Sequence, residues 1–399
     1  MDATLNPYTP GAGTPPLELA GRDDEIGAVK LLLARVAAGR HQRSMIITGL
    51  RGVGKTVLLN QFEALAAEAG WVVALQEIPS PRDHPRDFRE LAASMVRRAM
   101  YDLSRGKQMT DAIKHAFGVL RSFRPKVTIG ESGALEFSID IARVDGLADS
   151  GNITTDLGDL LVELGRLAKS QNRPVLFLFD EVQYLGIADL AALVTAIHRV
   201  DQKSLPVSLI AAGLPQLPAL VGEAKSYAER LFDFRRIGQL DDAAARRALV
   251  VPARPSLEYS AEAIALLLVE SDRYPHFIQE WGWATWNCAR RSPATPDDVR
   301  SARTEALASL DRGFFDVRYE RATARERDYL RAMAALGQGP YRSGAVAERL
   351  GVKPSGAAPI RDGLMAKGLV YAPSYGLIDF TVPHFDTYLG RRAVEIRGR

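Results

Sequence analysis

The stretch of sequence that decides the fold is the loop Gly49-Leu50-Arg51-Gly52-Val53-Gly54-Lys55-Thr56. It satisfies the pattern G-x-x-x-x-G-K-[ST], and it lies between a short β-rich run at 44–48 and a helical run that follows. Glycines let the backbone of such a loop curl so that successive N–H groups face phosphate oxygens. The pattern predicts a loop that binds the phosphates of a nucleoside triphosphate, which we expect to be ATP.

Individual residues of this loop have distinct predicted roles. We expect Lys55 to place its ammonium between the β- and γ-phosphates, and the hydroxyl of Thr56 to bind Mg²⁺. The side chain of Arg51 need not touch the nucleotide. The candidate nucleotide-binding residues here are Gly49, Leu50, Arg51, Gly52, Val53, Gly54, Lys55, Thr56 and the following Val57.

Two adjacent acids follow a second apolar strand. The run from Val175 to Phe179 is uninterrupted, as expected for a strand buried on both faces, and Asp180 and Glu181 follow it directly. We expect Asp180 to hold Mg²⁺, directly or through water, and Glu181 to polarise the attacking water. The alternative is two carboxylates that merely end a strand. Their adjacency, in a chain with this loop, favours hydrolysis over passive binding.

Strands and helices alternate along the first 240 residues. Uninterrupted or alternating apolar strands separated by amphipathic helices predict an α/β domain with a mainly parallel sheet. The helical spacing is clearest between 23 and 38, and a possible hairpin spans 126–141. The predicted strands are 44–48, 71–78, 174–179 and 206–212.

The C-terminal part has a different pattern. Helices are expected at 325–336, 343–350 and 354–367, followed by two strands within 368–382. A helix-turn-helix followed by a hairpin resembles a winged helix, whose third helix can enter the major groove of DNA. Pro359 and Gly363 weaken that helix, however, and winged helices also bind proteins. The candidate DNA contacts are Lys353, Ser355 and Arg361 at the third helix, and Arg391 and Arg392 along phosphates.

The charge distribution is uneven. From Arg318 to the end there are 14 Lys/Arg and 8 Asp/Glu, a net charge of +6, so the preceding 317 residues carry −3 of the total +3. A basic terminal part behind a near-neutral body is typical of nucleic-acid contact. The alternative is that the same net charges come from an arginine-rich face exposed to solvent.

Composition limits the class of protein further. With 399 residues, 47% hydrophobic and 25% charged, the chain is expected to form two or three globular domains. No apolar run approaches the roughly 20 residues that cross a bilayer, and the N-terminus lacks the features of a signal peptide. The single cysteine, Cys288, excludes an internal disulfide and is expected in the core. We therefore expect a cytoplasmic protein without a membrane partner.

Together these residues resemble the AAA+ ATPases, particularly the bacterial and archaeal group similar to the origin-recognition-complex ATPases, with the STAND signalling ATPases as close relatives. The resemblance covers about 17–390 and begins at Gly21-Arg22, where the family has an arginine beside the adenine. It implies that Arg22 lies in the nucleotide pocket; the alternative is a solvent-facing arginine at a helix start. The parts implied are a flexible segment 1–16, an α/β nucleotide-binding domain 17–240, an all-α lid 241–312 and a winged-helix domain 313–399.

Two family features differ from the usual pattern or have competing candidates. The polar sensor expected after the strand ending at Ala212 is displaced, which leaves Gln216 as its candidate. Arg230 stands in a segment that resembles the box carrying the arginine finger, with Arg235 and Arg236 as competitors. An arginine finger would reach the nucleotide of a neighbouring subunit, which implies a homo-oligomer on ATP binding.

The expected lid also departs from the family pattern. Where a Gly-x-Pro-Arg sensor is usual, the sequence has Pro275 followed by His276. A histidine gives a weaker and pH-dependent charge, so either Arg273 substitutes or hydrolysis is slow. His276 can equally be a packing residue. Both Pro275 and His276 remain candidates for the nucleotide pocket.

The resemblance implies a slow ATPase that uses ATP and Mg²⁺ and acts as a nucleotide-dependent, DNA-associated switch or loader. The alternative is a STAND-like regulatory ATPase whose winged helix docks a protein partner instead of DNA. A transposition-associated ATPase of the same broad clan is a third, weaker interpretation.

Overall fold

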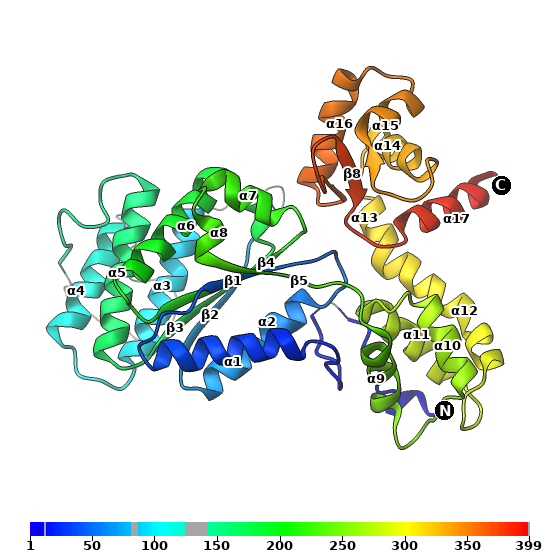
Figure 1. The fold of residues 1–399 in the computed structure, drawn as a ribbon, viewed down its shortest axis with the longest axis horizontal. Coiled ribbons are helices and arrows are strands. Elements are labelled where there is room, and N and C mark those ends of the chain that lie inside the picture. The colour runs from blue at the N-terminus through cyan, green and yellow to red at the C-terminus, as the bar shows by residue number, and fades with distance from the viewer. Residues whose placement is uncertain (12, 81–86, 124–141, 398–399) are drawn as a thin grey trace.

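A five-stranded parallel sheet forms the centre of the N-terminal half of the chain (Figure 1). The computed structural model describes residues 1–11, 13–80, 87–123 and 142–397. The strand order is β2-β3-β4-β1-β5, and every neighbouring pair is parallel. The predicted α/β class with a parallel sheet is confirmed. The strands are β1 (Ser44–Thr48), β2 (Val72–Glu77), β3 (Val175–Asp180), β4 (Val207–Gly213) and β5 (Phe232–Arg236).

Helices cover both faces of this sheet because alternate strand residues point to opposite sides. Leu176 and Leu178 of β3 pack in one core with α1 (Asp23–Ala37) and α2 (Lys55–Glu68). Phe177 and Phe179 lie in a second core on the other face. The helices of that second face are α3 (Phe88–Ser104), α4 (Asp111–Phe123), α5 (Ile153–Ser170), α6 (Ile187–Gln202), α7 (Leu217–Ala224) and α8 (Ala228–Leu231).

A helical lid follows β5 and lies beside the carboxyl ends of the strands (Figure 1). Its last helix continues directly into a π-helical turn, Asp311–Asp316, and the short helix α13, Val317–Tyr319. This connector leads out of the lid toward the C-terminal part of the chain. The lid helices are α9 (Asp242–Ala253), α10 (Ala261–Glu270), α11 (Pro275–Cys288) and α12 (Pro296–Leu310).

The N-terminal segment, which was predicted to be flexible over 1–16, lies against the lid. Tyr8 is 0% exposed, and its hydroxyl lies 2.7 Å from that of Tyr259. An added Cβ on Gly282 of α11 would come within 2.5 Å of the Tyr8 ring. The side chain of Trp286 donates to the carbonyl of Asp2 at 2.9 Å. One aromatic residue in a proline- and glycine-rich stretch therefore anchors the segment to the core.

The C-terminal module, which we define as residues 324–397, has the helix order and antiparallel sheet that the winged-helix prediction requires. Its three-stranded sheet has the order β6-β8-β7, and the second and third helices are joined by a short turn. Strand β6 and helix α17 were not predicted. The elements are α14 (Ala324–Ala334), β6 (Tyr341–Arg342), α15 (Ser343–Arg349), α16 (Pro354–Ala366), β7 (Val370–Tyr371), β8 (Leu377–Phe380) and α17 (Phe385–Arg397).

Two sequence predictions need a further statement. The hairpin predicted at 126–141 lies outside the described residues. In the described part of the chain, no helix combines the length and the apolar character needed to cross a membrane.

Candidate functional site

The phosphate loop joins the end of β1 to the start of α2, as the sequence predicted. Gly52 and Gly54 have φ angles of +84° and +92°, in the left-handed region that glycine adopts without strain. Gly49 is needed for a different reason, because an added Cβ would lie 2.5 Å from the carbonyl oxygen of Ile237. The glycines of the motif therefore set the curvature of the loop and its close approach to the chain after β5.

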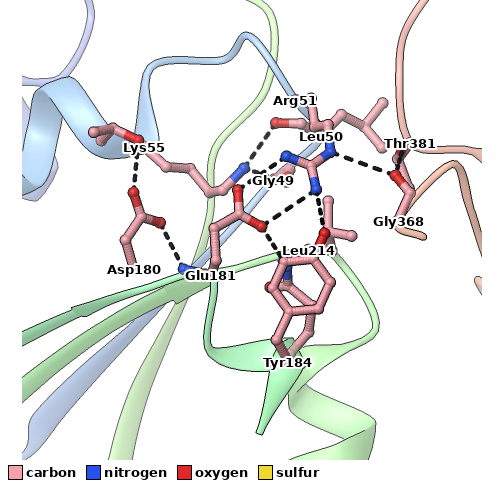
Figure 2. A network of polar contacts seen from close by, with 12 residues as sticks. Gly49, Leu50, Arg51, Lys55, Asp180, Glu181, Tyr184, Leu214, Gly368 and Thr381 are labelled. Carbon is pink, nitrogen blue, oxygen red and sulfur yellow. Dashed lines mark hydrogen bonds and ion pairs between the residues drawn. The ribbon is translucent and has the colours of Figure 1, made fainter. Parts of the chain in front are cut away.

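The side chain of Lys55 lies across the phosphate loop. Its buried ammonium donates to the carbonyls of Gly49 and Leu50, both at 3.0 Å (Figure 2). Burial lowers the pKa of Lys55, while the nearby charges of Glu181 and Asp180 raise it. The ammonium thus lies at the centre of the loop with neutral partners that a phosphate oxygen can replace.

Thr56 and Asp180 meet across the sheet edge. The Thr56 hydroxyl donates to Oδ2 of Asp180 at 2.6 Å, which links the first turn of α2 to the end of β3. Burial and the adjacent Glu181 raise the pKa of Asp180, and the Thr56 hydrogen bond opposes them. A hydroxyl and a carboxylate are oxygen donors of the kind that Mg²⁺ accepts beside nucleotide phosphates. The donor set at this position therefore fits the predicted ion.

Glu181 lies beside this pair in a strained backbone conformation. Its φ of +56° is in the left-handed region, which is uncommon for a residue with a Cβ. Its carboxylate accepts from Arg51 at 3.1 Å and also from the side-chain amide of Gln183. The surrounding structure therefore holds the carboxylate at the phosphate loop instead of leaving it free.

Arg51 makes more contacts than the sequence indicated. Its guanidinium donates to Glu181, to the hydroxyl of Tyr184 at 2.8 Å, and to the carbonyl of Gly368 at 3.4 Å (Figure 2). Its backbone N–H donates to the carbonyl of Thr381 at 2.9 Å. Gly368 and Thr381 belong to the C-terminal module and lie more than 300 positions after Arg51 in the sequence. Arg51 therefore joins the acid pair to this distant module.

Arg22 contacts the loop from the opposite side. Its guanidinium donates to the carbonyls of Val53 at 3.1 Å and Gly238 at 2.7 Å. The side chain is buried, and burial lowers its pKa. A solvent-facing position is therefore wrong for Arg22, which instead ties the phosphate loop to the segment after β5.

Comparison with known proteins agrees with this geometry. Residues 18–210 match the family model described as an AAA ATPase domain, and residues 312–389 match a domain of unknown function, DUF8462. No curated protein matches the sequence. Residues 18–210 form an AAA ATPase domain. The predicted membership in the AAA+ ATPases is confirmed for this part of the chain.

Solved structures show where the fold recurs. The Walker-type ATPase PABY2304 of Pyrococcus abyssi is 16% identical, covers 93% of this chain and 96% of its own, and has a TM-score of 0.56. ORC1 of Aeropyrum pernix, solved in complex with DNA, is 16% identical over 96% of each chain, with a TM-score of 0.46. Cdc6p of Pyrobaculum aerophilum is 15% identical over 99% and 98%, with a TM-score of 0.47. At these identities, only the first similarity shows a shared fold.

In the ATPase domain, the side chain of Gln183 occupies the place after β4 where the polar sensor was expected. This residue was not identified from the sequence. Gln183 accepts from the backbone N–H of Leu214 at 3.0 Å and donates to Glu181. A Cβ on Gly213 would lie 2.6 Å from the Gln183 amide oxygen, so the glycine makes room for it. The predicted sensor, Gln216, instead precedes α7, and its buried side-chain oxygen has no partner among the described residues. A polar residue two positions after Glu181 was the available signal.

The candidate arginine fingers lie on α8 and β5 of the ATPase domain. Arg230 is exposed in α8, where a neighbouring subunit could meet it. Arg235 pairs with Asp233 at 2.8 Å, and Arg236 is exposed. The structure thus leaves Arg230 as a surface residue with no partner in its own described chain.

The lid reaches the ATPase domain through the first turn of α11, which begins at Pro275. The backbone N–H of His276 donates to the carbonyl of Gly52 at 3.2 Å. Burial and the charge of Arg318 lower the pKa of His276 to about 4, so its ring is neutral at pH 7. Arg273, by contrast, is partly exposed and pairs with Asp242 at 2.7 Å. Neither residue places a positive charge on the loop in this arrangement.

The candidate DNA contacts fall into two groups. Lys353 and Ser355 are exposed at the start of α16. Arg361 pairs with the adjacent Asp362 at 3.1 Å. Arg391 and Arg392, at the other end of the module, form ion pairs within the chain, with Asp311 and Asp316 of the connector respectively. Two of the predicted phosphate contacts therefore fasten α17 to the connector.

Proposed function

We propose that this protein is a nucleotide-dependent switch that binds ATP with Mg²⁺ and hydrolyses it slowly. The observation that carries the proposal is the position of Arg51, which contacts Glu181 and the C-terminal module at once. Nucleotide at the loop and the placement of the module are then coupled through one side chain.

The residues divide the chemistry among them. The ammonium of Lys55 moves from the loop carbonyls to the β- and γ-phosphates, and the loop N–H groups hold the same oxygens. Thr56 and Asp180 would hold Mg²⁺, which would neutralise negative charge on the phosphates. Glu181 accepts a proton from the attacking water.

The switch follows because the C-terminal module and the phosphates compete for the same backbone N–H groups of the loop. The backbone N–H of Arg51 donates to the carbonyl of Thr381, although a phosphate oxygen needs N–H groups of this same loop. ATP therefore weakens the contact with the C-terminal module. The guanidinium of Arg51 then loses its partner at Gly368 and can leave Glu181.

Slow turnover is supported by two features of the same site. Glu181 is engaged by both Arg51 and Gln183, so water activation requires a rearrangement. The neutral His276 stands where the family usually has an arginine, so the lid supplies less positive charge there. The exposed Arg230 supports a further step in which ATP-bound copies associate.

We propose that the partner is DNA and that its binding depends on the nucleotide state, because the chain from Arg318 onward carries a net charge of +6. The ion pairs of Arg391 and Arg392 specifically favour the second candidate, a protein partner of the module, because they leave fewer free cations for phosphates. The two candidates share the nucleotide switch and differ only in what the released module binds.

A salt titration of DNA binding separates them. Full-length protein is mixed with labelled duplex at several salt concentrations, with and without ATP, and binding is followed by gel shift. For the DNA-bound switch, affinity changes with ATP and falls as salt rises, with a shallower slope for Lys353→Ala. No shift on any duplex contradicts the DNA reading, and failure of the wild-type protein to bind ATP contradicts the switch itself.

A further inference from the structure

Arg318 lies where the ATPase domain, the lid and the C-terminal module meet. It follows the π-helical turn Asp311–Asp316, by which the lid continues toward the C-terminal module. π-Helical turns are rare, and they occur often at functional sites. The sequence alone did not single out this arginine as a site residue.

Among the side chains that the structure describes, the guanidinium of Arg318 has no acidic partner in an ion pair. It lies 4.3 Å from the centre of the Phe314 ring and donates to the backbone carbonyl of Phe314 in the preceding turn. Within 1–11, 13–80, 87–123 and 142–393, no carboxylate forms an ion pair with it. By comparison, Arg391 and Arg392 in the same region each have an aspartate. Arg318 is thus a partly buried cation held in place by an aromatic ring.

That ring places Arg318 beside the phosphate loop. A Cβ on Gly52 would lie 3.2 Å from the Phe314 ring, so the ring packs directly on the loop backbone. The ring of His276 lies 4.7 Å from Phe314 and closes the same side. The Phe314 ring therefore contacts both the Arg318 cation and the backbone of the loop at Gly52.

The electrostatic setting of Arg318 favours an anion that the chain itself does not supply. Burial and, to a smaller extent, the like charges of Arg51 and Arg321 lower the pKa of Arg318 to about 10. Glu181 acts in the opposite direction, but it is already paired with Arg51. A partly buried cation among other cations is destabilising unless an anion joins it. The anion for which this loop is built is a triphosphate.

We propose that Arg318 binds the γ-phosphate of ATP and takes the place of the arginine that is absent at position 276. This inference rests on the proposed binding of ATP at the loop. A contact with the γ-phosphate lets the site distinguish ATP from ADP. Since Arg318 lies in the connector, the contact also transmits that difference to the C-terminal module.

The test compares ATP and ADP binding to the full-length protein. Affinities for ADP and for a non-hydrolysable β,γ-imido analogue of ATP are measured by calorimetry with Mg²⁺ present. We expect Arg318→Ala to lose roughly 10- to 100-fold in affinity for the ATP analogue, as for a charge-assisted hydrogen bond, with ADP affinity changed less than about threefold. Arg318→Lys, which keeps the charge without the planar fork, is expected to fall between.

Two matched variants and the ADP measurement distinguish a direct contact of Arg318 with the γ-phosphate from a general effect of positive charge. Arg312→Ala removes an exposed arginine of the same connector and should leave both affinities unchanged. Arg321→Ala removes a neighbouring exposed charge; an equal loss there would assign the effect to the general positive field and overturn the proposal. Equal binding of the analogue by Arg318→Ala and wild type overturns it while the proposed function stands. No binding by wild type overturns both.

Discussion

The guanidinium of Arg51 pairs with the carboxylate of Glu181 at 3.1 Å, so the phosphate loop itself holds the residue that we expect to activate water. Both side chains are largely shielded, at 18% and 14% exposed, which limits screening by solvent. The same arginine reaches Gly368 of the C-terminal module. The pair therefore links the chemistry of the site to the position of a distant part of the chain.

Removing this link should speed hydrolysis. We expect Arg51→Ala to raise the turnover at saturating ATP roughly fivefold, because freeing Glu181 from a shielded pair is worth about 1 kcal/mol. Phosphate release is the measurement, and Arg51→Lys, which keeps a positive charge, is the control. A fall in turnover for Arg51→Ala would show that the arginine assists catalysis instead of restraining it.

Substitution of Glu181 separates binding from hydrolysis. Glu181→Gln keeps the shape of the side chain but cannot take a proton, so we expect turnover to fall about 100- to 10,000-fold. Affinity for ATP should stay within about threefold, because the phosphates are held by the loop. Turnover equal to that of wild type would remove Glu181 from its proposed role.

Lys55 provides the complementary case. Lys55→Ala removes the charge that the phosphates need, and we expect roughly 100-fold weaker ATP binding in calorimetry. The fold should persist without nucleotide, because the hydrogen bonds of the Lys55 ammonium go to two loop carbonyls, those of Gly49 and Leu50. A thermal melt with an unchanged midpoint is the control. ATP affinity that survives the substitution would place the phosphates elsewhere.

His276 predicts a defined acid sensitivity. Its pKa is about 4 in the folded protein against an ordinary value of 6.5, so protonation favours the unfolded chain. The stability that its neutral ring provides is present above pH 6.5 and is lost as pH falls toward 4, by up to about 3 kcal/mol. Urea unfolding of wild type and His276→Gln between pH 7.5 and 4 measures the difference. Parallel curves over that range would contradict the buried, neutral assignment.

The N-terminal anchor predicts a large effect from a single residue. Tyr8→Ala should lower the free energy of unfolding by about 3 to 5 kcal/mol, since it empties a fully buried aromatic site. Tyr8→Phe should cost only about 1 kcal/mol, for the lost hydroxyl contact with Tyr259. Leu5→Ala, at a position 64% exposed, is the control. Equal unfolding curves for Tyr8→Ala and Leu5→Ala would show that the segment does not stabilise the fold.

The sequence by itself determined the parallel α/β architecture, the phosphate loop and the acid pair. Each of these depends on residues close together in the chain: glycines that permit left-handed backbone at Gly52 and Gly54, and apolar strands that alternate with amphipathic helices. Local spacing fixes local geometry, so the position of Lys55 and the ends of β1 and β3 could be predicted without a structure.

Only the tertiary structure decided how the remaining polar side chains are used. The contacts of Arg51 with Gly368, of Gln183 with Leu214, and of Arg391 with Asp311 join elements far apart in the chain. No period or motif signals such pairs, because they arise when packed surfaces bring together groups that must satisfy their hydrogen bonds and charges. Packing therefore decides that Glu181 is restrained and that two predicted DNA contacts hold α17 in place. It also decides that Arg318 lies beside the loop with no carboxylate paired to it among the described side chains.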